Sequence, residues 1–327
     1  MTRRSGLSLI EVLVALFIMG LGVIAILTMF PLGAYQMAVA VREDRSAQSA
    51  AAADAYIRTY WKAYVVQGPN PPTETFYNAL SDPNAGLTGG LSAFARTPPA
   101  AGGLPLASLN EPGYPVLTDP MGYVARSGAS QVWGGDGGAT NAPRRILNQI
   151  VNNQHAQRVC SLMDGLAYDD DGRPVNPAAP TSADRELRYN WLWVVQRTNA
   201  NPFAASLTVV VFDRRAHLYA PAGSEQVFTA TANVGTSSVA LSGTPDVKPG
   251  GWIMDATVTQ ISAGGPWIRN ANFYRVTAVN GNTLELQSPI KTPTTALSPA
   301  PGSYTGTFVV MRGVSGVYVR PPLSAND

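Results

Sequence analysis

The feature of this sequence that most constrains its fold is a long apolar run near the N-terminus. The run extends from Leu7 to Phe30 and contains a single charged residue, Glu11. As a helix it would be roughly 36 Å long, which is enough to cross the hydrocarbon core of a bilayer, about 30 Å thick. It is also longer than the apolar region of a cleaved secretory signal. We therefore predict a transmembrane helix over residues 7–30.

Glu11 is costly inside such a span, on the order of 3 kcal/mol at the bilayer centre. A carboxylate in this place needs a partner, and the sequence upstream indicates one. The Gly6-Leu7 bond lies between the basic pair Arg3-Arg4 and the apolar run. Cleavage after Gly6 would create a positively charged amine on Leu7, which could pair with Glu11 of a neighbouring copy.

These residues resemble a known signal. The run Gly6-Leu7-Ser8-Leu9-Ile10-Glu11 and the apolar helix behind it are similar to the class III signal of type IV prepilins and type II secretion pseudopilins. The residue after the cut is usually Phe in that family, and here it is Leu7. The resemblance covers residues 1–30 and implies that a prepilin peptidase cleaves after Gly6 and methylates the new N-terminus. It also implies that Glu11 serves in filament assembly.

The function that the resemblance implies is that of a minor pilin or pseudopilin, a structural subunit of a type IV pilus or a type II secretion filament. Such a protein is not an enzyme. Its expected partners are other pilins or pseudopilins, the prepilin peptidase and the inner-membrane assembly platform. Its length of 327 residues favours a minor subunit, because major pilins are usually shorter. Pilus and type II secretion both remain open.

The expected location is a single pass through the inner membrane. Arg3 and Arg4 precede the span and keep that end in the cytoplasm by the positive-inside rule. The head then lies outside the cytoplasm. An alternative from another class also remains open, a membrane-tethered β-rich binding module that does not polymerise.

Pro31 and Gly33 interrupt the helical pattern directly after the span. Pro31 lacks an amide hydrogen, and its ring crowds the preceding turn. Two interpretations are open: a kink or locally unwound segment at residues 27–33, or a break at the membrane boundary. The pattern then resumes as a helical stalk over residues 31–64, which should end near Gly68. Apolar spacing places four aromatic or aliphatic residues on one face of this stalk: Ile57, Tyr60, Trp61 and Tyr64.

The composition favours an extracytoplasmic β-rich head. Charged residues make up 13% of the chain, against roughly 25% in average soluble domains. Gly (31 residues) and Pro (26 residues) are frequent, which favours turns and short strands. The net charge of +2 and the lack of a basic block beyond the leader give no indication of nucleic-acid binding. Cys160 is the only cysteine, so an intramolecular disulfide is excluded.

Period-two alternation predicts the central strands of the head. Tyr189, Trp191, Trp193 and Val195 alternate with other residues, and a second run follows a turn at residues 198–202. We expect two long antiparallel strands packed on the N-terminal helix, with Trp191 and Trp193 facing it. The second of these strands covers Leu207–Phe212. Further strands are predicted at Gln226–Val234, Ser238–Ser242, Trp252–Gln260, Phe273–Val279, Thr283–Gln287, Thr305–Arg312 and Val317–Arg320.

Turn signals connect some of these strands. Asn280-Gly281 lies between two of the runs and predicts a hairpin with a type I′ turn. Residues 313–316 favour a second hairpin. The first five of the further strands would form a small sandwich or barrel, inserted into the head or appended to it.

Taken together, the patterns predict an α+β fold. A long N-terminal helix, membrane-spanning in its first half, packs on an antiparallel sheet, and an additional β-rich region follows. Loops are expected over much of residues 68–142, with a short helix around Phe76–Leu80, and a helix at Arg144–Met163. The predicted parts are a leader (1–6), a transmembrane helix (7–30), a helical stalk (31–64), a pilin-like α+β head (65–222) and a β-rich extension of the head (223–327).

The sequence contains few candidate catalytic or metal-binding residues. His155 and His217 are the only histidines and are far apart in the sequence. No nucleophile elbow, Walker loop or dinucleotide fingerprint is present, so neither catalysis nor a cofactor is expected.

A run of aspartates resembles a fragment of a calcium loop, with Asp169 and Asp171 as candidate ligands. Asp164 and Asp184 are further candidates for the same ion. No Glu stands at the distance that an EF-hand loop requires. A solvated Asp-Gly turn is therefore the favoured interpretation.

Overall fold

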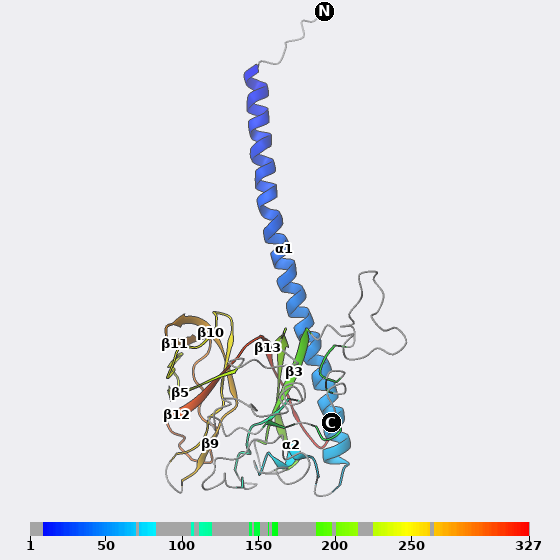
Figure 1. The fold of residues 1–327 in the computed structure, drawn as a ribbon, viewed down its shortest axis with the longest axis vertical. Helices are drawn as coiled ribbons and strands as arrows, with labels where there is room; N and C mark the ends of the chain where they lie inside the picture. The colour runs from blue at the N-terminus through cyan, green and yellow to red at the C-terminus, as the bar shows by residue number, and fades with distance from the viewer. Residues whose placement is uncertain are drawn as a thin grey trace, which may run out of the picture. The chain divides into compact units, whose positions relative to one another are not determined.

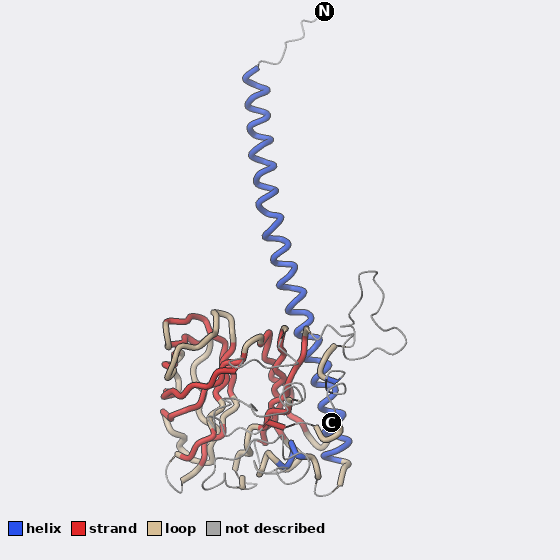
Figure 2. Tube along the Cα trace, viewed as in Figure 1, coloured by secondary structure: helices blue, strands red, loops and turns tan. Residues whose placement is uncertain are grey.

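The protein is described from a computed structural model, which divides the chain into two compact units, Met1–Arg45 and Ser46–Asp327. The N-terminal helix α1 (Leu9–Tyr60) contains the boundary between them. Figures 1 and 2 show the helix and the strands that follow it. The residues that the structure describes are 9–69, 72–82, 106–107, 111–119, 144–145, 147–150, 156, 159–162, 188–197, 201–214, 225–261 and 265–326.

Pro31 lies inside α1, and the helix continues through it. The locally unwound segment predicted at residues 27–33, and the alternative of a break at the membrane boundary, are therefore not what the structure has. A helix can accept an internal proline when the remaining hydrogen bonds of the turn hold. The kink at Pro31 stays a prediction.

The C-terminal end of the helix has a different geometry. A π-helix, η1 (Trp61–Val66), follows α1 directly, and the helical segment ends before Gly68, as predicted. A Cβ at Gly68 would lie 2.2 Å from the carbonyl oxygen of Tyr64, so only glycine fits where the chain leaves the helix. A short helix, α2 (Thr75–Asn78), comes next and overlaps the one predicted around residues 76–80.

The second unit contains a five-stranded sheet with the order β13-β4-β3-β1-β2. All pairings are antiparallel except that of β1 with β2. The strands are β1 (Val116–Thr118), β2 (Arg144–Arg145), β3 (Tyr189–Arg197), β4 (Ala205–Asp213) and β13 (Val314–Leu323).

The predicted helix at Arg144–Met163 is wrong at its start. Residues 144–145 form β2, and residues 148–149 form a turn. The helical pattern of residues 144–145 is weak, and pairing with β1 gives their backbone N–H and C=O groups hydrogen-bond partners in the neighbouring strand. Strand formation is therefore favoured over a helix there. Of the other described residues in this range, Ala156 and Val159 are helical.

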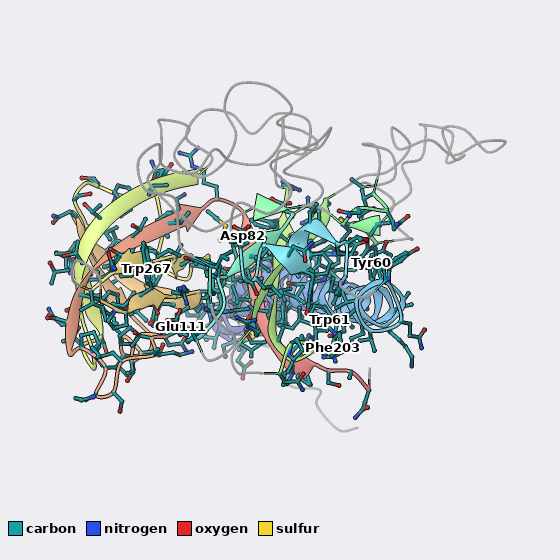
Figure 3. All side chains as sticks on the ribbon, turned by 90° about the horizontal axis from the view of Figure 1, so that it is seen from below. Tyr60, Trp61, Asp82, Glu111, Phe203 and Trp267 are labelled. Atoms are coloured by element: carbon teal, nitrogen blue, oxygen red, sulfur yellow. The ribbon has the colours of Figure 1, made fainter. Side chains whose placement is uncertain are left out.

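One face of the sheet packs against α1, as expected from the tryptophans. Trp191 and Trp193 are buried in the same core as Ala53 and Ile57 of the helix. The indole nitrogen of Trp193 donates to the carbonyl oxygen of Ala53 over 2.9 Å. This bond satisfies a polar atom that the burial of Trp193 would otherwise leave unpaired. Figure 3 shows Tyr60 and Trp61 in this region, at the end of the helix.

The sheet is buried on its other face too. Leu192, Val194 and Val210 from β3 and β4 pack against Met254 and Val309 of a second β-structure. Strand β3 is consequently buried along almost its whole length. The sequence had predicted one buried face only, that of the tryptophans.

The second β-structure is a six-stranded antiparallel sheet with the order β5-β12-β7-β10-β11-β6. A bridge between Ala230 and Leu241 joins its first and last members, so the sheet is nearly closed into a barrel. The predicted hairpin joins β10 and β11, but its turn residues are Gly281 and Asn282, because Asn280 pairs with Thr283 at the end of β10. Gly281 has a φ of 63° and Asn282 does not have a positive φ, so the predicted type I′ turn at Asn280-Gly281 is wrong. The strands are β5 (Glu225–Asn233), β6 (Ser238–Ala240), β7 (Trp252–Asp255), β10 (Asn272–Asn280), β11 (Thr283–Leu286) and β12 (Ser303–Met311).

Two predictions about this region need correction. Residues 252–260 form two strands, β7 and β8 (Val258–Gln260), because the Asp255 side chain accepts a hydrogen bond from the Thr257 amide and turns the chain between them. Strand β8 pairs with β9 (Trp267–Arg269) instead of continuing the barrel.

The second correction concerns residues 313–316, which do not close a hairpin. Strand β12 pairs with β5 and β7, whereas β13 pairs with β4. The turn at Gly313, with a φ of 79°, passes the chain from the barrel to the five-stranded sheet. The barrel is therefore inserted between β4 and β13, and the division of the head at residue 222 does not follow the sheets.

Asp255 is the polar centre of the barrel and is fully buried. Its Oδ2 accepts hydrogen bonds from Asn270 Nδ2 (2.8 Å) and from the Tyr304 hydroxyl (2.7 Å), and its Oδ1 accepts from Thr257. Burial raises the pKa of Asp255, although these donors act in the opposite direction. Burial likewise raises the pKa of Glu74, which accepts from the Tyr60 hydroxyl over 2.8 Å.

Trp193→Ala should lower the free energy of unfolding by about 3–5 kcal/mol, the usual cost of removing a large buried aromatic side chain. The lost hydrogen bond to Ala53 adds to the lost packing. Val319→Ala on β13 is the matched control, because Val319 is 79% exposed, and it should change stability by less than about 0.5 kcal/mol. Urea unfolding of the full-length protein in detergent measures both, and equal losses would contradict this assignment of the core.

Asp255 and Glu74 should make the protein more stable at mildly acidic pH. Their pKa values are higher in the folded protein than in the unfolded chain, so their contribution is full below the unfolded values of about 4. It is lost as the pH rises through the folded values, by about 1.4 kcal/mol for each unit of pKa difference. Asp255→Asn should weaken this pH dependence, and Glu285→Gln, which changes an exposed carboxylate of β11, should not.

Denaturant unfolding of the full-length protein at a series of pH values between about 4 and 7 measures this effect. The quantity to compare is the slope of the unfolding free energy against pH in the three proteins. An unchanged slope in Asp255→Asn would show that Asp255 does not contribute to it.

Candidate functional site

The first unit presents an apolar helical surface. Along the described part of α1, large apolar side chains from Leu9 to Val41 are exposed around the helix. Within the part of the chain that the structure describes, this is the one helix long and apolar enough to cross a membrane, and none of its most apolar stretch is buried in the protein. The surface is therefore suited to lipid or to other helices, and it supports membrane anchoring.

Glu11 lies in the first turn of α1 as described and is exposed. A carboxylate in this position interacts favourably with the positive end of the helix dipole. The cleavage-site residues Gly6 and Leu7 lie outside the described residues, so the structure does not place them beside Glu11. No other charged residue follows until Arg42.

The other predicted site residues are mostly outside the described ranges. This applies to Asp169 and Asp171, the candidate calcium ligands, and to His155 and His217. Among the residues that are described, no group of three or more His, Cys, Asp or Glu side chains could hold a metal ion.

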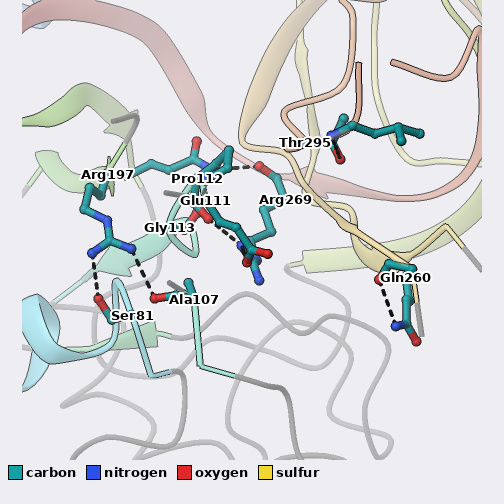
Figure 4. A network of polar contacts seen from close by, with 12 residues as sticks. Ser81, Ala107, Glu111, Pro112, Gly113, Arg197, Gln260, Arg269 and Thr295 are labelled. Atoms are coloured by element: carbon teal, nitrogen blue, oxygen red, sulfur yellow. Dashed lines mark hydrogen bonds and ion pairs between the residues drawn. The ribbon is translucent and has the colours of Figure 1, made fainter. Parts of the chain in front are cut away.

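A polar cluster that the sequence did not indicate lies at the junction of the sheet and the barrel (Figure 4). Arg269 of β9 donates from Nη1 to Glu111 Oε2 (3.1 Å) and to the carbonyl oxygen of Pro112 (2.6 Å). Gln196 of β3 donates from Nε2 to the carbonyl oxygens of Gly113 (3.0 Å) and of Arg269 (2.7 Å). The segment at residues 111–114 is thereby held between β3 and β9.

Arg197, the neighbour of Gln196 on β3, extends the cluster. Its Nη1 donates to Ser81 Oγ (3.1 Å) and its Nη2 to the carbonyl oxygen of Ala107 (3.2 Å). Burial lowers the pKa of Arg197, and the positive charge of Arg269 lowers it further. In Figure 3, Glu111 lies between the helix-packed sheet and Trp267 of strand β9. No local pattern could have indicated the cluster, because its members come from distant parts of the chain.

Comparison with known proteins identifies the N-terminal segment. Residues 1–27 match the family model of the prokaryotic N-terminal methylation motif. The chain therefore carries the type IV pilin-like signal, and this signal supports a type IV pilin-like precursor. None of the curated proteins compared with the chain matches it.

Among solved structures, the phage phi92 endosialidase is similar to part of the chain. The match covers 46% of this chain and 22% of that chain, with 10% sequence identity and a TM-score of 0.17. A likeness of this size carries no argument about the fold or the function of the second unit.

Proposed function

We propose that the protein is a minor pilin or pseudopilin, a structural subunit of a type IV pilus or a type II secretion filament. A prepilin peptidase cleaves it after Gly6, and it then assembles with other pilins through α1. It crosses the inner membrane once, with the second unit outside the cytoplasm. Support comes from the methylation motif at residues 1–27 and from the exposed apolar helix behind it.

The extent of the exposed apolar surface is the observation that carries this proposal. No charged residue stands between Glu11 and Arg42. A helix of that length is roughly 45 Å long, about 15 Å more than a bilayer core. Tyr35, Met37 and Val41 lie in the excess part and are exposed. A lone copy would leave them in water, whereas packing against the helices of other subunits would cover them.

Glu11 has a role that fits the same assembly. Cleavage after Gly6 would leave an ammonium group on Leu7, and a neighbouring subunit's Glu11 would accept a charge-assisted hydrogen bond from it. A buried pair of this kind fixes the axial register of two helices more than it adds net stability. The apolar side chains then hold neighbouring helices together, and the charge pair sets the axial position of one helix relative to the next.

The size of the second unit supports a minor subunit. A barrel is inserted into a sheet that α1 already covers on its other face, so each copy carries a bulky head on one helix. Such a head suits a tip or priming position better than a closely repeated one. Pilus and secretion filaments share all of these features, and the proposal covers both.

The processing step predicts a mature N-terminus at Leu7, carrying an N-methyl group. N-terminal mass spectrometry of the membrane form, from cells with an active prepilin peptidase, measures it. Gly6→Val should block cleavage because its branched side chain crowds the scissile bond. Ser5→Ala, which changes the residue before it, is the matched control and should be cleaved normally. An intact Met1 end in the wild type, or a cut near residue 33, would contradict the proposal.

Glu11→Leu should leave membrane insertion unchanged or improved, because it removes a cost on the order of 3 kcal/mol in hydrocarbon. Cleavage after Gly6 should also persist. Incorporation into sheared filaments, or co-purification with other pilins at matched membrane levels, should fall. Glu11→Asp should give an intermediate result, since it keeps the charge and shortens the reach. Leu13→Val, a nearby apolar change, should assemble as the wild type does.

The second candidate function, a membrane-tethered binding module that does not polymerise, has one observation in its favour. Strands β5 and β12 carry three cross-strand pairs of uncharged polar residues: Thr229–Thr307, Thr231–Thr305 and Asn233–Ser303. Most of these side chains are exposed, and together they form a patch of six uncharged polar residues on the barrel, five of which carry hydroxyl groups. If Glu11→Leu assembles as well as the wild type, this second function becomes the better explanation.

A further inference from the structure

A continuous series of aromatic side chains crosses the core between the five-stranded sheet and the end of the N-terminal helix. The Trp193 ring of β3 stacks on the Tyr56 ring of α1, with 6.0 Å between their centroids. The centroid of Tyr56 lies 6.2 Å from that of Tyr60, and the centroid of Tyr60 lies 4.5 Å from that of Tyr64 in η1. These separations are typical of interacting aromatic pairs. Each ring of this aromatic series is therefore the direct neighbour of the next.

The aromatic series leads from the interior of the head to its surface. Trp193 is fully buried and Tyr60 is 4% exposed, whereas Tyr64 is 37% exposed. Cys160 is buried in the same core. Tryptophan and tyrosine are the aromatic side chains that lose one electron most easily, and all members of the series are of these two types. The series is therefore a route by which an electron can move between the core and Tyr64.

Tyr60 has a proton acceptor beside it. Its hydroxyl group donates to Glu74 Oε2 over 2.8 Å, and Glu74 is 3% exposed. The same carboxylate oxygen accepts from the backbone amide of Asn148 over 3.2 Å. Both donors are neutral, so neither cancels the negative charge of the ionised carboxylate. Glu74 is thus a base in direct contact with the phenol.

This contact matters because a tyrosine that loses an electron must also lose its proton. Burial raises the pKa of Tyr60 above the ordinary value of about 10, and the charge of Glu74 raises it further, so the phenolate does not form beforehand. An acceptor within hydrogen-bond reach must then take the proton during the electron transfer. Trp193 differs, because its indole nitrogen donates to the carbonyl oxygen of Ala53, a very weak base. An oxidised Trp193 therefore keeps its proton and recovers an electron from Tyr60.

We propose that the aromatic series carries oxidising equivalents out of the core of the head, from Trp193 to the surface at Tyr64. A one-electron reductant in solution removes them there. The activity protects the buried Trp193 and Cys160 from irreversible oxidation. It belongs to the second unit alone, and it does not depend on filament assembly.

The steps balance in electrons and protons. An oxidising radical accepts one electron from Trp193 and leaves an indole radical cation. One electron then moves from Tyr60 through the Tyr56 ring to Trp193, while the O–H bond of Tyr60 breaks and its proton passes to Glu74. Next, Tyr64 gives one electron to the Tyr60 radical and its own proton to water, and Glu74 returns the proton to Tyr60. The reductant finally supplies one electron to Tyr64, which takes a proton from water.

The test uses the full-length protein in detergent. A laser flash photoionises the tryptophans, and nitrous oxide with tert-butyl alcohol removes the ejected electrons and the radicals that they form. Transient absorption should show a phase in which the tryptophan radical decays as the tyrosyl radical appears. In a parallel sample, a nitroso spin trap marks the radical, and peptide mass spectrometry should locate the adduct at Tyr64.

Tyr60→Phe should abolish the coupled phase, because phenylalanine interrupts the aromatic series without changing its packing greatly. Glu74→Gln keeps the shape of the side chain and removes the base. It should slow the phase by at least about 10²-fold, the lower end of what a positioned general base contributes. It should also reduce the adduct at Tyr64. Tyr274→Phe is the matched control, because Tyr274 is a buried tyrosine of the barrel core, and it should behave as the wild type does.

Two results would overturn the proposal. One is a coupled phase of unchanged rate and amplitude in Tyr60→Phe. The other is an adduct at Tyr64 that is equally frequent in the wild type and in Glu74→Gln. Circular dichroism establishes that each variant is folded. If Tyr60→Phe does not fold, the rate of the coupled phase in Glu74→Gln decides the question, and a rate equal to that of the wild type overturns the proposal.

Discussion

The second unit depends on one constraint: its central sheet must be covered on both faces. The tryptophan face of β3 packs on α1, and the face that carries Leu192 and Val194 packs on the barrel. Removing either cover would expose a broad apolar surface to water, with a cost of about 25 cal/mol per Å². Helix, sheet and barrel are therefore energetically one structure, although the barrel has a core of its own.

The two parts of α1 have different surroundings. From Leu9 to Val41 its apolar side chains are exposed, and they require lipid or neighbouring helices. From Ala50 to Trp61 its apolar side chains are buried in the head, with small residues such as Ala50 and Ala53 allowing a close approach to the sheet. Arg42 to Arg45 separate these two environments with charges. One continuous helix thus combines an exposed apolar surface with a structural element of the head.

The features that could be predicted from the sequence are those whose pattern lies within one short segment of the chain. Periodicity alone located α1, β3, β4 and most barrel strands, and Asn280-Gly281 located a hairpin. The signal at Gly6–Glu11 is a contiguous motif, and its family match agrees with it. The docking of the barrel on β3 and the return of β13 depend on contacts between distant residues. Arg269 and Glu111 are 158 positions apart, so no spacing rule could have paired them.

Strand β13 has a consequence for the order in which the protein is completed. It is the last strand in the chain, yet it pairs with β4 and contacts the start of the head's helix, where the Tyr318 hydroxyl donates to Ser46 Oγ over 2.9 Å. These two residues are separated by 272 positions. Contacts of such long range form slowly, because the intervening chain must be brought together first. The five-stranded sheet cannot be completed until its last strand is present, so a chain that lacks its C-terminal residues would leave the edge of β4 without a partner strand.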